Sequence, residues 1–521
     1  MVATLPAPDL AQAEHVVGLA AGLVGSGIRQ MVAAGGPDAS QSLAYDLAHA
    51  AAQVETARAM LDYGRHGADE AMLTCAFVAD MLHDLISRVI GREDRWGVDM
   101  SGIRDAGPFL AAYRDADTVA ALAETPGPTH LDDEMDMVAA TFRSFADKVV
   151  RQHAEHVHRH NDDVPEEIIT GLAEMGAFGL SVPAEYGGFS EGGANEYVGM
   201  VVATEELSRG SLGIGGSLIT RPEILTRALV KGGTERQKAE WLPRLATAEV
   251  MPAVAVTEPD YGSDVASIKV TATPAAGPGG EPGYAINGVK TWCTFAARAD
   301  VLALLARTDP DKSKAHRGLS LFIVPKPRGE GHGFAFTQDG TGGTMEGRPI
   351  DTIGYRGMHS YEIALDNWWV PAENLVGEGD GLGKGFIFQM AGFENGRLQT
   401  AARAVGVPAD KVKTALFMAT SLMGCFVGTM ILMRLNSVQA QQGDGQEFEY
   451  IIAAVVGGNL MTGGYGSVIG ASLGALIMAI SKNGIPAARW NQDGRFIFLG
   501  VVLLVAVLVN NYVRKKANEQ R

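Results

Sequence analysis

Three long runs without a charged residue follow Lys413, and they constrain the fold of this 521-residue chain more than any other feature. The runs span residues 414–433, 450–481 and 496–513. A helix of about 20 apolar residues crosses the roughly 30 Å hydrocarbon core of a bilayer. A soluble core can hold one such helix, but three in succession favour a membrane, so we expect a membrane segment over residues 412–513.

The charges that flank these runs predict which side of the membrane the ends occupy. Lys411 and Lys413 precede the first run, and three consecutive cations, residues 514–516, follow the last one. Positive charges favour the cytoplasmic side, so both ends are expected there and the number of crossings is even. The glycine-rich middle run then either crosses twice or enters and leaves on one side. Its stretch GSVIGASLG, residues 466–474, has the small-residue spacing by which membrane helices pack closely.

The rest of the chain differs from this segment in its charge. The formal charge of the whole chain is −17, yet residues 409–521 carry a net +4, which leaves −21 for the part before them. An acidic surface argues against nucleic-acid binding, because phosphate contacts need a basic face. The N-terminus lacks a basic n-region and carries Asp9 and Glu14 before its first apolar run, which argues against a secretory signal.

The residues that bind metals or form disulfides are sparse. The three cysteines have no CxxC or Cys/His spacing, which indicates neither a disulfide framework nor a zinc site and is typical of a reducing cytosol: Cys75, Cys293 and Cys425. His153, His156 and His160 share one helical face, as the ligands of a metal site would. A solvated helix face explains them better, so we expect no metal. The acidic part is expected in the cytoplasm, tethered to the inner membrane by residues 412–513.

The residue pattern divides the chain into five regions. The bounds are residues 1–125, with apolar side chains at helical spacing; 126–250, a linker and a second helical stretch; 251–376, short β-rich runs between turn clusters; 377–408, a glycine-rich turn and one helix; and 409–521. We therefore expect an α+β chain. A helical N-terminal extension precedes a helical domain and a β-barrel domain, and the first helix of a truncated C-terminal bundle runs into transmembrane helices.

Two motifs in the third region carry the chemistry. VAVTEPDYGSDVASIKV, residues 254–270, and NGVKTWCTFAARAD, residues 287–300, resemble the acyl-CoA dehydrogenase family, in which a TEPxxGSD loop and a KxWxT strand cradle the flavin. SVPAEYGG, ATEELSRGSLGIGG and IGYRGMHSYEIALDNWW support the likeness, in the family's order, over about residues 130–407. The resemblance implies FAD, an acyl-CoA substrate, an electron-transfer flavoprotein as electron acceptor and a homo-oligomer.

The resemblance also assigns residues to the flavin. Val256 and Thr257 are expected along its ring system, and Ser263 at its pyrophosphate. Trp292 and Thr294 are expected at the opposite ring face and at the N5 edge. The alternative for Trp292 and Thr294 is an ordinary strand that faces a barrel core.

The chemistry of thioester oxidation defines what else the site needs. A base must take the α-proton, and because no side chain accepts a hydride from the β-carbon, a flavin must. The family's base is a Glu on the C-terminal bundle, or a Glu two positions beyond Glu394, where this chain has Gly396. The base is thus expected to be absent, with Glu394 as the remaining candidate, and the activity to be impaired. Glu394 and Arg397 match positions that contact coenzyme A in the family; the alternative is a solvated helix face.

The acyl group is the next question. The sheet region and the helical extension are most similar to the family members that oxidise a methylsuccinyl thioester. Such a substrate has a second, free carboxylate, which needs a cation to offset its desolvation. Arg221, in SLITRPEIL, matches the region at the far end of the family's acyl pocket and is the residue that we expect to bind this carboxylate.

The C-terminal segment resembles a second family. The runs AVVGG and GGYGS, within residues 410–521, are similar to the last part of the permease subunit of ribose- or xylose-type ABC sugar importers. A complete permease has more spans before this point, and the chain has no ATPase motif. The sequence therefore looks like a chimera. Beside an impaired dehydrogenase, two alternatives stay open: an incomplete component of a sugar importer, or a fusion without a function of its own.

Overall fold

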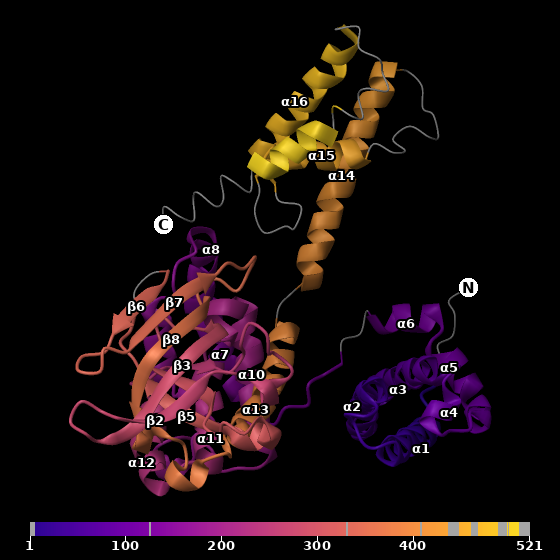
Figure 1. Cartoon of the computed structure of the whole chain (residues 1–521). Coiled ribbons are helices and arrows are strands. Elements are labelled where there is room, and N and C mark those ends of the chain that lie inside the picture. The colour runs from indigo at the N-terminus through magenta and orange to yellow at the C-terminus, as the bar shows by residue number, and fades with distance from the viewer. Residues whose placement is uncertain are drawn as a thin grey trace. The chain divides into compact units, whose positions relative to one another are not determined.

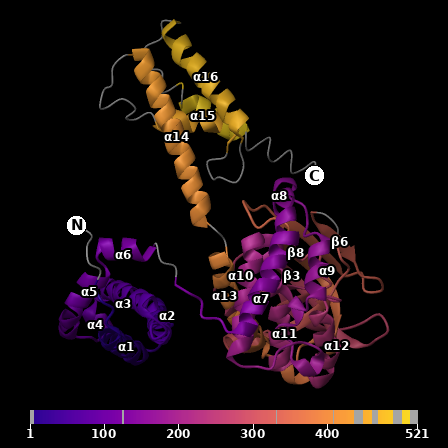
Figure 2. The same cartoon turned by 180° about the vertical axis from the view of Figure 1, so that it is seen from behind.

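The computed structural model describes residues 6–123, 127–329, 332–406, 409–435, 447–459, 467–487, 498 and 500–509. The chain divides into two compact units, Met1–Leu131 and Asp132–Arg521. Figures 1 and 2 show both units from opposite sides. Each unit has its own hydrophobic core, so each is described by itself.

The first unit is helical, as the apolar spacing predicts. Its elements are α1 (Leu10–Ala33), α2 (Gln41–Tyr63), α3 (Ala68–Val89), α4 (Glu93–Trp96), η1 (Ser101–Ala106), α5 (Gly107–Tyr113) and α6 (Ala116–Ala123). Asp9 caps α1, because its carboxylate accepts a hydrogen bond from the backbone N–H of Gln12 at 2.9 Å. Trp96 is fully buried and closes the core between these helices. In the part of the chain that is described, α1 is the helix long and apolar enough to cross a membrane, although one face of it packs in this core.

The second unit begins with a helical layer. Its elements are α7 (Asp133–Phe145), η2 (Ala146–Val150), α8 (Arg151–His160), α9 (Glu166–Glu174), η3 (Ala177–Gly179), η4 (Ala184–Tyr186), α10 (Ala194–Gly210), η5 (Leu212–Gly216), α11 (Thr220–Gly232) and α12 (Glu235–Ala246). Thr234 and Gln237 form a capping box that fixes the start of α12. After the sheet, α13 (Gly385–Gly406) returns to this layer and packs against α10 and α11.

The sheet of the second unit has eight strands. They are β1 (Pro252–Ala255), β2 (Thr271–Ala276), β3 (Pro282–Thr294), β4 (Val301–Arg307), β5 (Leu319–Pro325), β6 (Phe334–Thr337), β7 (Thr344–Ile350) and β8 (Ser360–Pro371), with η6 (Val265–Ser267), η7 (Lys312–Gly318), η8 (Ala372–Asn374) and η9 (Glu378–Gly381) in the connections. The order is β1-β4-β2-β3-β8-β7-β6, and β5 also pairs with β4. Among the described strands, no pairing joins β6 to β1 or β5, so the expected β-barrel stays a prediction.

The last part of the chain contains α14 (Ala409–Leu435), α15 (Glu447–Val456) and α16 (Val468–Ala487). Its apolar helical stretches are Phe417–Val427, Val468–Ser481 and Gly500–Val509, all shorter than the roughly 20 residues of a membrane span. The structure therefore supports the expected transmembrane segment only weakly. The middle run falls partly outside the described residues, so its number of crossings stays a prediction.

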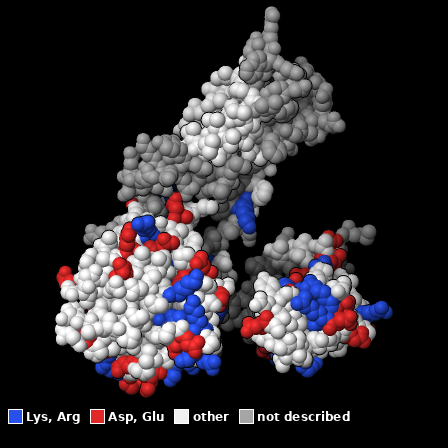
Figure 3. All heavy atoms as spheres, viewed as in Figure 1, with Lys and Arg blue, Asp and Glu red and all other residues white. Residues whose placement is uncertain are grey.

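Small residues bring α15 and α16 together. A Cβ atom added at Gly474 would lie 1.9 Å from the carbonyl oxygen of Ala453, so only glycine permits this approach of the two helices. Apolar side chains lie on the outside of the same helices, where Val468 is 84% exposed. Figure 3 shows charged side chains of both signs on the two compact units, while the described atoms near the top of the view are mainly uncharged.

Candidate functional site

The two motifs of the sheet meet at one place. The TEPDYGSD motif follows β1, and the KTWCT motif forms the last residues of β3. The backbone N–H of Thr291 donates a hydrogen bond to the carbonyl oxygen of Thr257 at 2.8 Å. This bond holds the loop after β1 beside the end of β3, although the two residues are far apart in the sequence.

A buried ion pair between Lys290 and Glu258 holds the loop after β1 against the end of β3. Lys290 is fully buried (0% exposed), and its Nζ donates to Glu258 Oε1 and to the carbonyl oxygen of Val256, each at 2.9 Å. Glu258 also accepts from the backbone N–H groups of Lys269 and Val270, at 2.6 and 2.9 Å. Burial lowers the pKa of Lys290, and the Glu258 carboxylate opposes this. The sequence analysis missed the pair; its one signal is a lysine inside an otherwise apolar strand.

Trp292 lies at an irregularity of β3. The pairing of β3 with β8 shifts between Lys290 and Cys293, and Trp292 has a left-handed backbone with φ 58°. A bulge of this kind redirects a side chain, and the indole of Trp292 is 56% exposed. The side chain therefore does not face the core. A strained backbone that holds a large apolar ring in solvent is a feature of ligand sites.

The other residues assigned to the flavin lie around this junction or beyond it. Thr294 is half-buried, and its hydroxyl is 3.0 Å from that of Ser360 on β8. The side chain of Val256 is buried in the core, whereas Thr257 is half-buried. Ser263 is exposed in the turn before η6. The structure thus brings together Val256, Thr257 and the end of β3, and shows no contact between Ser263 and them.

Arg221 lies in the first turn of α11 and is 8% exposed. Its Nε atom has no hydrogen-bond partner among the described residues. Burial lowers the pKa of its guanidinium, and the charge of Arg403 on α13 lowers it further, while Tyr355 raises it. Arg403 itself donates to the hydroxyl oxygens of Ser217 and Tyr355, at 2.8 and 3.2 Å. The sequence analysis did not single out Arg403.

The residues expected to contact coenzyme A lie on the outside of α13. Glu394 and Arg397 are both exposed. The charge of Glu394 acts on Arg227, where it opposes the lowering of the pKa that burial causes. A Cβ atom added at Gly396 would have one neighbour, a methyl group of Ile224 at 3.9 Å. The position of the family's alternative base therefore has space for a side chain and carries none.

A buried carboxyl group lies on the neighbouring helix and was not expected. Glu223 on α11 accepts a hydrogen bond from the side-chain amide of Asn395 at 2.6 Å and pairs with Arg227 at 3.1 Å. Burial raises its pKa, and the bond from Asn395 opposes the change. Because Arg227 also pairs with Glu196, these groups form a network that joins α10, α11 and α13.

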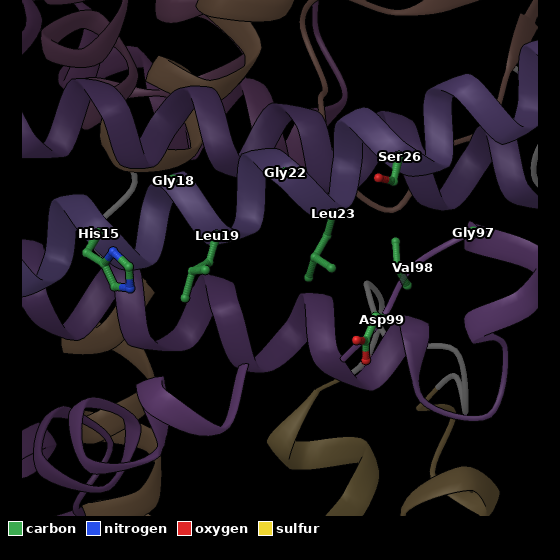
Figure 4. A pocket seen from close by; sticks show the side chains of 9 residues that line it. All are labelled: His15, Gly18, Leu19, Gly22, Leu23, Ser26, Gly97, Val98 and Asp99. Carbon is green, nitrogen blue, oxygen red and sulfur yellow. The ribbon is translucent and has the colours of Figure 1, made fainter. Parts of the chain in front are cut away.

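Two further features lie outside this region. His156, His160 and Asp162 are exposed and place their ligand atoms within 4.8 Å of one another, while His153 pairs with Glu167 instead. The first unit has a hollow of about 440 Å³ between α1 and the turn after α4, lined by small and apolar residues such as Gly18 and Val98 and by the polar residues His15, Ser26 and Asp99. Figure 4 shows the residues that line it. None of the residues assigned to the flavin or the substrate lines this hollow.

Comparison with protein families divides the second unit. Residues 132–249 match the acyl-CoA dehydrogenase N-terminal domain, and residues 253–368 match the middle domain of the same family. Residues 396–507 match the permease component of branched-chain amino acid transport systems. The chain therefore contains both kinds of domain, which supports the interpretation as a chimera. The permease match begins inside α13, at Gly396.

Individual relatives match about half of this chain. The chain is 44% identical over 292 residues to (2S)-methylsuccinyl-CoA dehydrogenase of Cereibacter sphaeroides, covering 56% of this chain and 50% of the relative. It is 32% identical over 278 residues to the mitochondrial isovaleryl-CoA dehydrogenase of Solanum tuberosum, covering 53% and 61%. A solved complex of glutaryl-coenzyme A dehydrogenase with glutaryl-CoA is 30% identical, covers 54% and 64%, and has a TM-score of 0.46. The chain covers 50% to 64% of the length of these three relatives.

Proposed function

We propose that this chain, which carries the N-terminal and middle domains of the acyl-CoA dehydrogenases, oxidises an acyl-CoA thioester at its α and β carbons with FAD. One observation carries the proposal: the hydrogen bond between Thr291 and Thr257 joins the two motifs that the resemblance assigns to the flavin. The bulge beside this bond holds the indole of Trp292 in solvent, where a flat ring system can stack on it.

The residues present fit a flavin. Trp292 offers an aromatic face, Thr294 a hydroxyl group, and Ser263 a second hydroxyl for the pyrophosphate. The ion pair of Lys290 with Glu258 fixes the backbone of the loop, so these groups are in place before a ligand arrives. When bound, FAD supplies the hydride acceptor that side chains lack.

The step that the chain is expected to perform poorly is proton removal. Position 396 is glycine, and Glu394 is exposed on α13. An exposed side chain on α13 is surrounded by water, whereas an effective base must lie within hydrogen-bond reach of the proton that it removes. We therefore propose that the chain binds thioesters and oxidises them slowly.

A methylsuccinyl thioester fits best as the substrate. The methylsuccinyl-CoA dehydrogenase of Cereibacter sphaeroides is 44% identical over the matched residues. Arg221 is buried and lacks a partner for its Nε, as a residue that receives a substrate carboxylate would. The remaining expectations complete the proposal: an electron-transfer flavoprotein accepts the electrons, the dehydrogenase part forms a homo-oligomer in the cytoplasm, and residues 412–513 tether it to the inner membrane.

The test is reduction of the bound flavin under anaerobic conditions. The full chain, purified in detergent and supplied with FAD, is expected to retain the cofactor and to change its visible absorbance at once when methylsuccinyl-CoA binds. Bleaching should then follow slowly. A chain that retains no FAD contradicts the proposed function. Immediate and complete bleaching contradicts the missing base and points to Glu394 or another carboxyl.

The permease match favours a second candidate, a component of an importer. We expect that the chain does not restore sugar uptake to a strain that lacks its own permease, because the segment matched is only part of such a subunit. Uptake above the background of that strain would support the importer. A stable and monodisperse flavoprotein in detergent would argue against a fusion without function.

A further inference from the structure

Two arginines of the helical layer lie close together without an acid between them. Arg221 comes from α11 and Arg403 from α13, two helices that pack against each other, and Arg403 donates to Ser217, four residues before Arg221. Among the described residues, no carboxylate oxygen lies within 4.0 Å of either guanidinium, although ion pairs are frequent elsewhere in the chain. Two neighbouring cations that lack a counter-charge in the protein require one from a ligand.

Burial makes this requirement stronger for Arg221. Its side chain is more than nine-tenths buried, and its Nε has no hydrogen-bond partner among the described residues. The loss of water favours the neutral form of a buried guanidinium, and the like charge of Arg403 adds to this effect. Arginine nevertheless stays protonated in proteins, so the buried Nε–H group remains a strong donor without an acceptor among the described residues.

Neutral oxygens hold Arg403 in position. Its Nη1 donates to Ser217 Oγ at 2.8 Å and to the hydroxyl of Tyr355 at 3.2 Å, and its Nη2 donates to Thr400 Oγ1 at 2.7 Å. Tyr355 lies in the loop before β8 with a left-handed backbone, φ 64°. These contacts fix the orientation of the guanidinium and leave its charge unneutralised. They bring three segments of the chain to one point: Ser217 before α11, Tyr355 before β8, and α13.

We propose that Arg221 and Arg403 together bind the free carboxylate of a dicarboxylic acyl thioester, and that Ser217 and Tyr355 position Arg403 for this contact. The inference rests on the proposed function and adds to it a second arginine and its supports. A guanidinium presents paired N–H groups that match the two oxygens of a carboxylate. A site with two such groups selects a diacid over a monoacid with the same coenzyme.

The phosphates of coenzyme A are the other source of an anion for this site. The burial of Arg221 favours the acyl carboxylate, because a phosphate monoester, with a charge of about −2 at neutral pH, would lose far more hydration there than a singly charged carboxylate. The two sources differ in a measurable way. Every coenzyme A thioester carries the phosphates, whereas only a dicarboxylic acyl group carries the extra carboxylate.

The test compares the binding of two thioesters, so it does not depend on turnover. The dissociation constants of methylsuccinyl-CoA and butyryl-CoA are measured by the absorbance change of FAD in the full chain and in Arg403→Gln, Arg221→Gln and Arg348→Gln. Arg348 is an exposed residue of β7 that pairs with Glu346, so it serves as the matched control. We expect Arg403→Gln and Arg221→Gln each to raise the dissociation constant of methylsuccinyl-CoA at least tenfold. The dissociation constant of butyryl-CoA should rise less than twofold. The control should change neither.

Two further variants separate positioning from folding. Tyr355→Phe keeps the charges of both arginines and should raise the dissociation constant of methylsuccinyl-CoA a few fold. Arg403→Lys should recover part of the affinity for methylsuccinyl-CoA that Arg403→Gln loses. Thermal melting of each variant shows whether it folds; if Arg221→Gln does not, Arg403→Gln and Tyr355→Phe still decide. Equal losses for both thioesters would assign the site to the coenzyme phosphates and overturn the proposal, as would no loss for either.

Binding to the unaltered chain separates a failure of the proposed function from a failure of the carboxylate site alone. If it binds neither FAD nor a thioester, the proposed function fails, and the two-arginine site falls with it. If it binds FAD and butyryl-CoA but shows no preference for methylsuccinyl-CoA, the proposed function stands and only the carboxylate site is wrong.

Discussion

The sheet, residues 252–371, and the C-terminal helices, residues 409–509, differ in which side chains they bury and which they expose. In the sheet, a fully buried lysine has a carboxylate partner and a carbonyl partner at hydrogen-bond distance. In the C-terminal helices, large apolar side chains such as Val468 and Phe417 lie on the surface. The first pattern is that of a water-soluble protein, where buried charges are paired. The second is that of a segment whose surroundings are lipid or another protein.

Both patterns occur on opposite faces of α13. The buried face of this helix carries amides such as Gln389 and Gln399, both nearly without exposure, as in the interior of an enzyme. Its outer face exposes Ile387, Leu398 and Val405. The middle-domain match ends at residue 368, before this helix, and the permease match begins inside it, at Gly396. One helix thus has an inner face that belongs to the dehydrogenase part and an outer face without a partner.

Removal of the C-terminal helices should have the largest effect. A chain that ends at Gly406 loses the exposed apolar surface of α14 to α16, so we expect it to move from the membrane fraction to the soluble fraction, by more than an order of magnitude. Membrane fractionation followed by size-exclusion chromatography without detergent measures this. If the full-length and shortened chains distribute equally between the membrane and soluble fractions, the exposed apolar side chains of the C-terminal helices do not bind the membrane.

Breaking the buried ion pair should have the next largest effect. Lys290→Met leaves Glu258 buried without its cation, and we expect a loss of about 3–5 kcal/mol in the free energy of unfolding. Urea denaturation of the chain ending at Gly406 measures it. The control is Glu346→Gln, which breaks the exposed pair with Arg348 and should cost less than about 1 kcal/mol. A similar loss in the free energy of unfolding for the two variants would show that the buried pair stabilises the fold no more than the exposed one.

Replacement of Trp292 should separate stability from cofactor binding. Glycine adopts the left-handed backbone of this position without strain, so Trp292→Gly should leave the free energy of unfolding unchanged or raise it by up to about 1 kcal/mol. Loss of the stacked ring should weaken FAD binding by about 1–2 kcal/mol, or roughly 5- to 30-fold. Fluorescence titration with FAD measures the second effect, and Trp292→Phe should retain most of the affinity. A large loss of stability would contradict the exposed position of the indole.

A pH dependence should be the smallest effect. Lys326, just after β5, donates to the carbonyl oxygens of Ala297, Ala299 and Pro327, but burial lowers its pKa to about 8. Between pH 8 and the ordinary value of 10.5, the unfolded chain binds more protons than the native one, so the free energy of unfolding rises with pH in this window. From pH 8 to 9 the rise should reach at most about 1 kcal/mol.

The rise is read as a difference between the unaltered chain and Lys326→Met, both ending at Gly406. Other groups that titrate at alkaline pH contribute equally to the two proteins and cancel. A constant difference from pH 7 to 10 would show that the three carbonyl oxygens hold the ammonium charged across this range.

The sequence predicts the helical regions and part of the sheet. Five strands are visible as apolar runs, but β2, β6 and β7 are not, because their side chains are largely exposed and include proline or glycine, as in TATPAA and TMEGRPI. The motifs point to Thr257 and Trp292 through resemblance. The partners Glu258 and Lys290 escape prediction, since 32 residues separate them and only the fold brings them together. The role of Arg403 is not predicted, because the apolar spacing of a helix does not show which residues its guanidinium will contact.

The burial of the cysteines has a practical consequence for the C-terminal helices. Cys75 and Cys293 are buried, and burial raises the pKa of Cys293 to about 12, whereas Cys425 on α14 is exposed. Thiol reagents attack the thiolate and need access to it, so a maleimide dye should label the folded chain at Cys425 alone. The natural sequence thus carries a single-site reporter in its first apolar run. A membrane-impermeant dye that reacts in detergent and not in intact vesicles would place Cys425 either inside the bilayer or on the inner side of the vesicle.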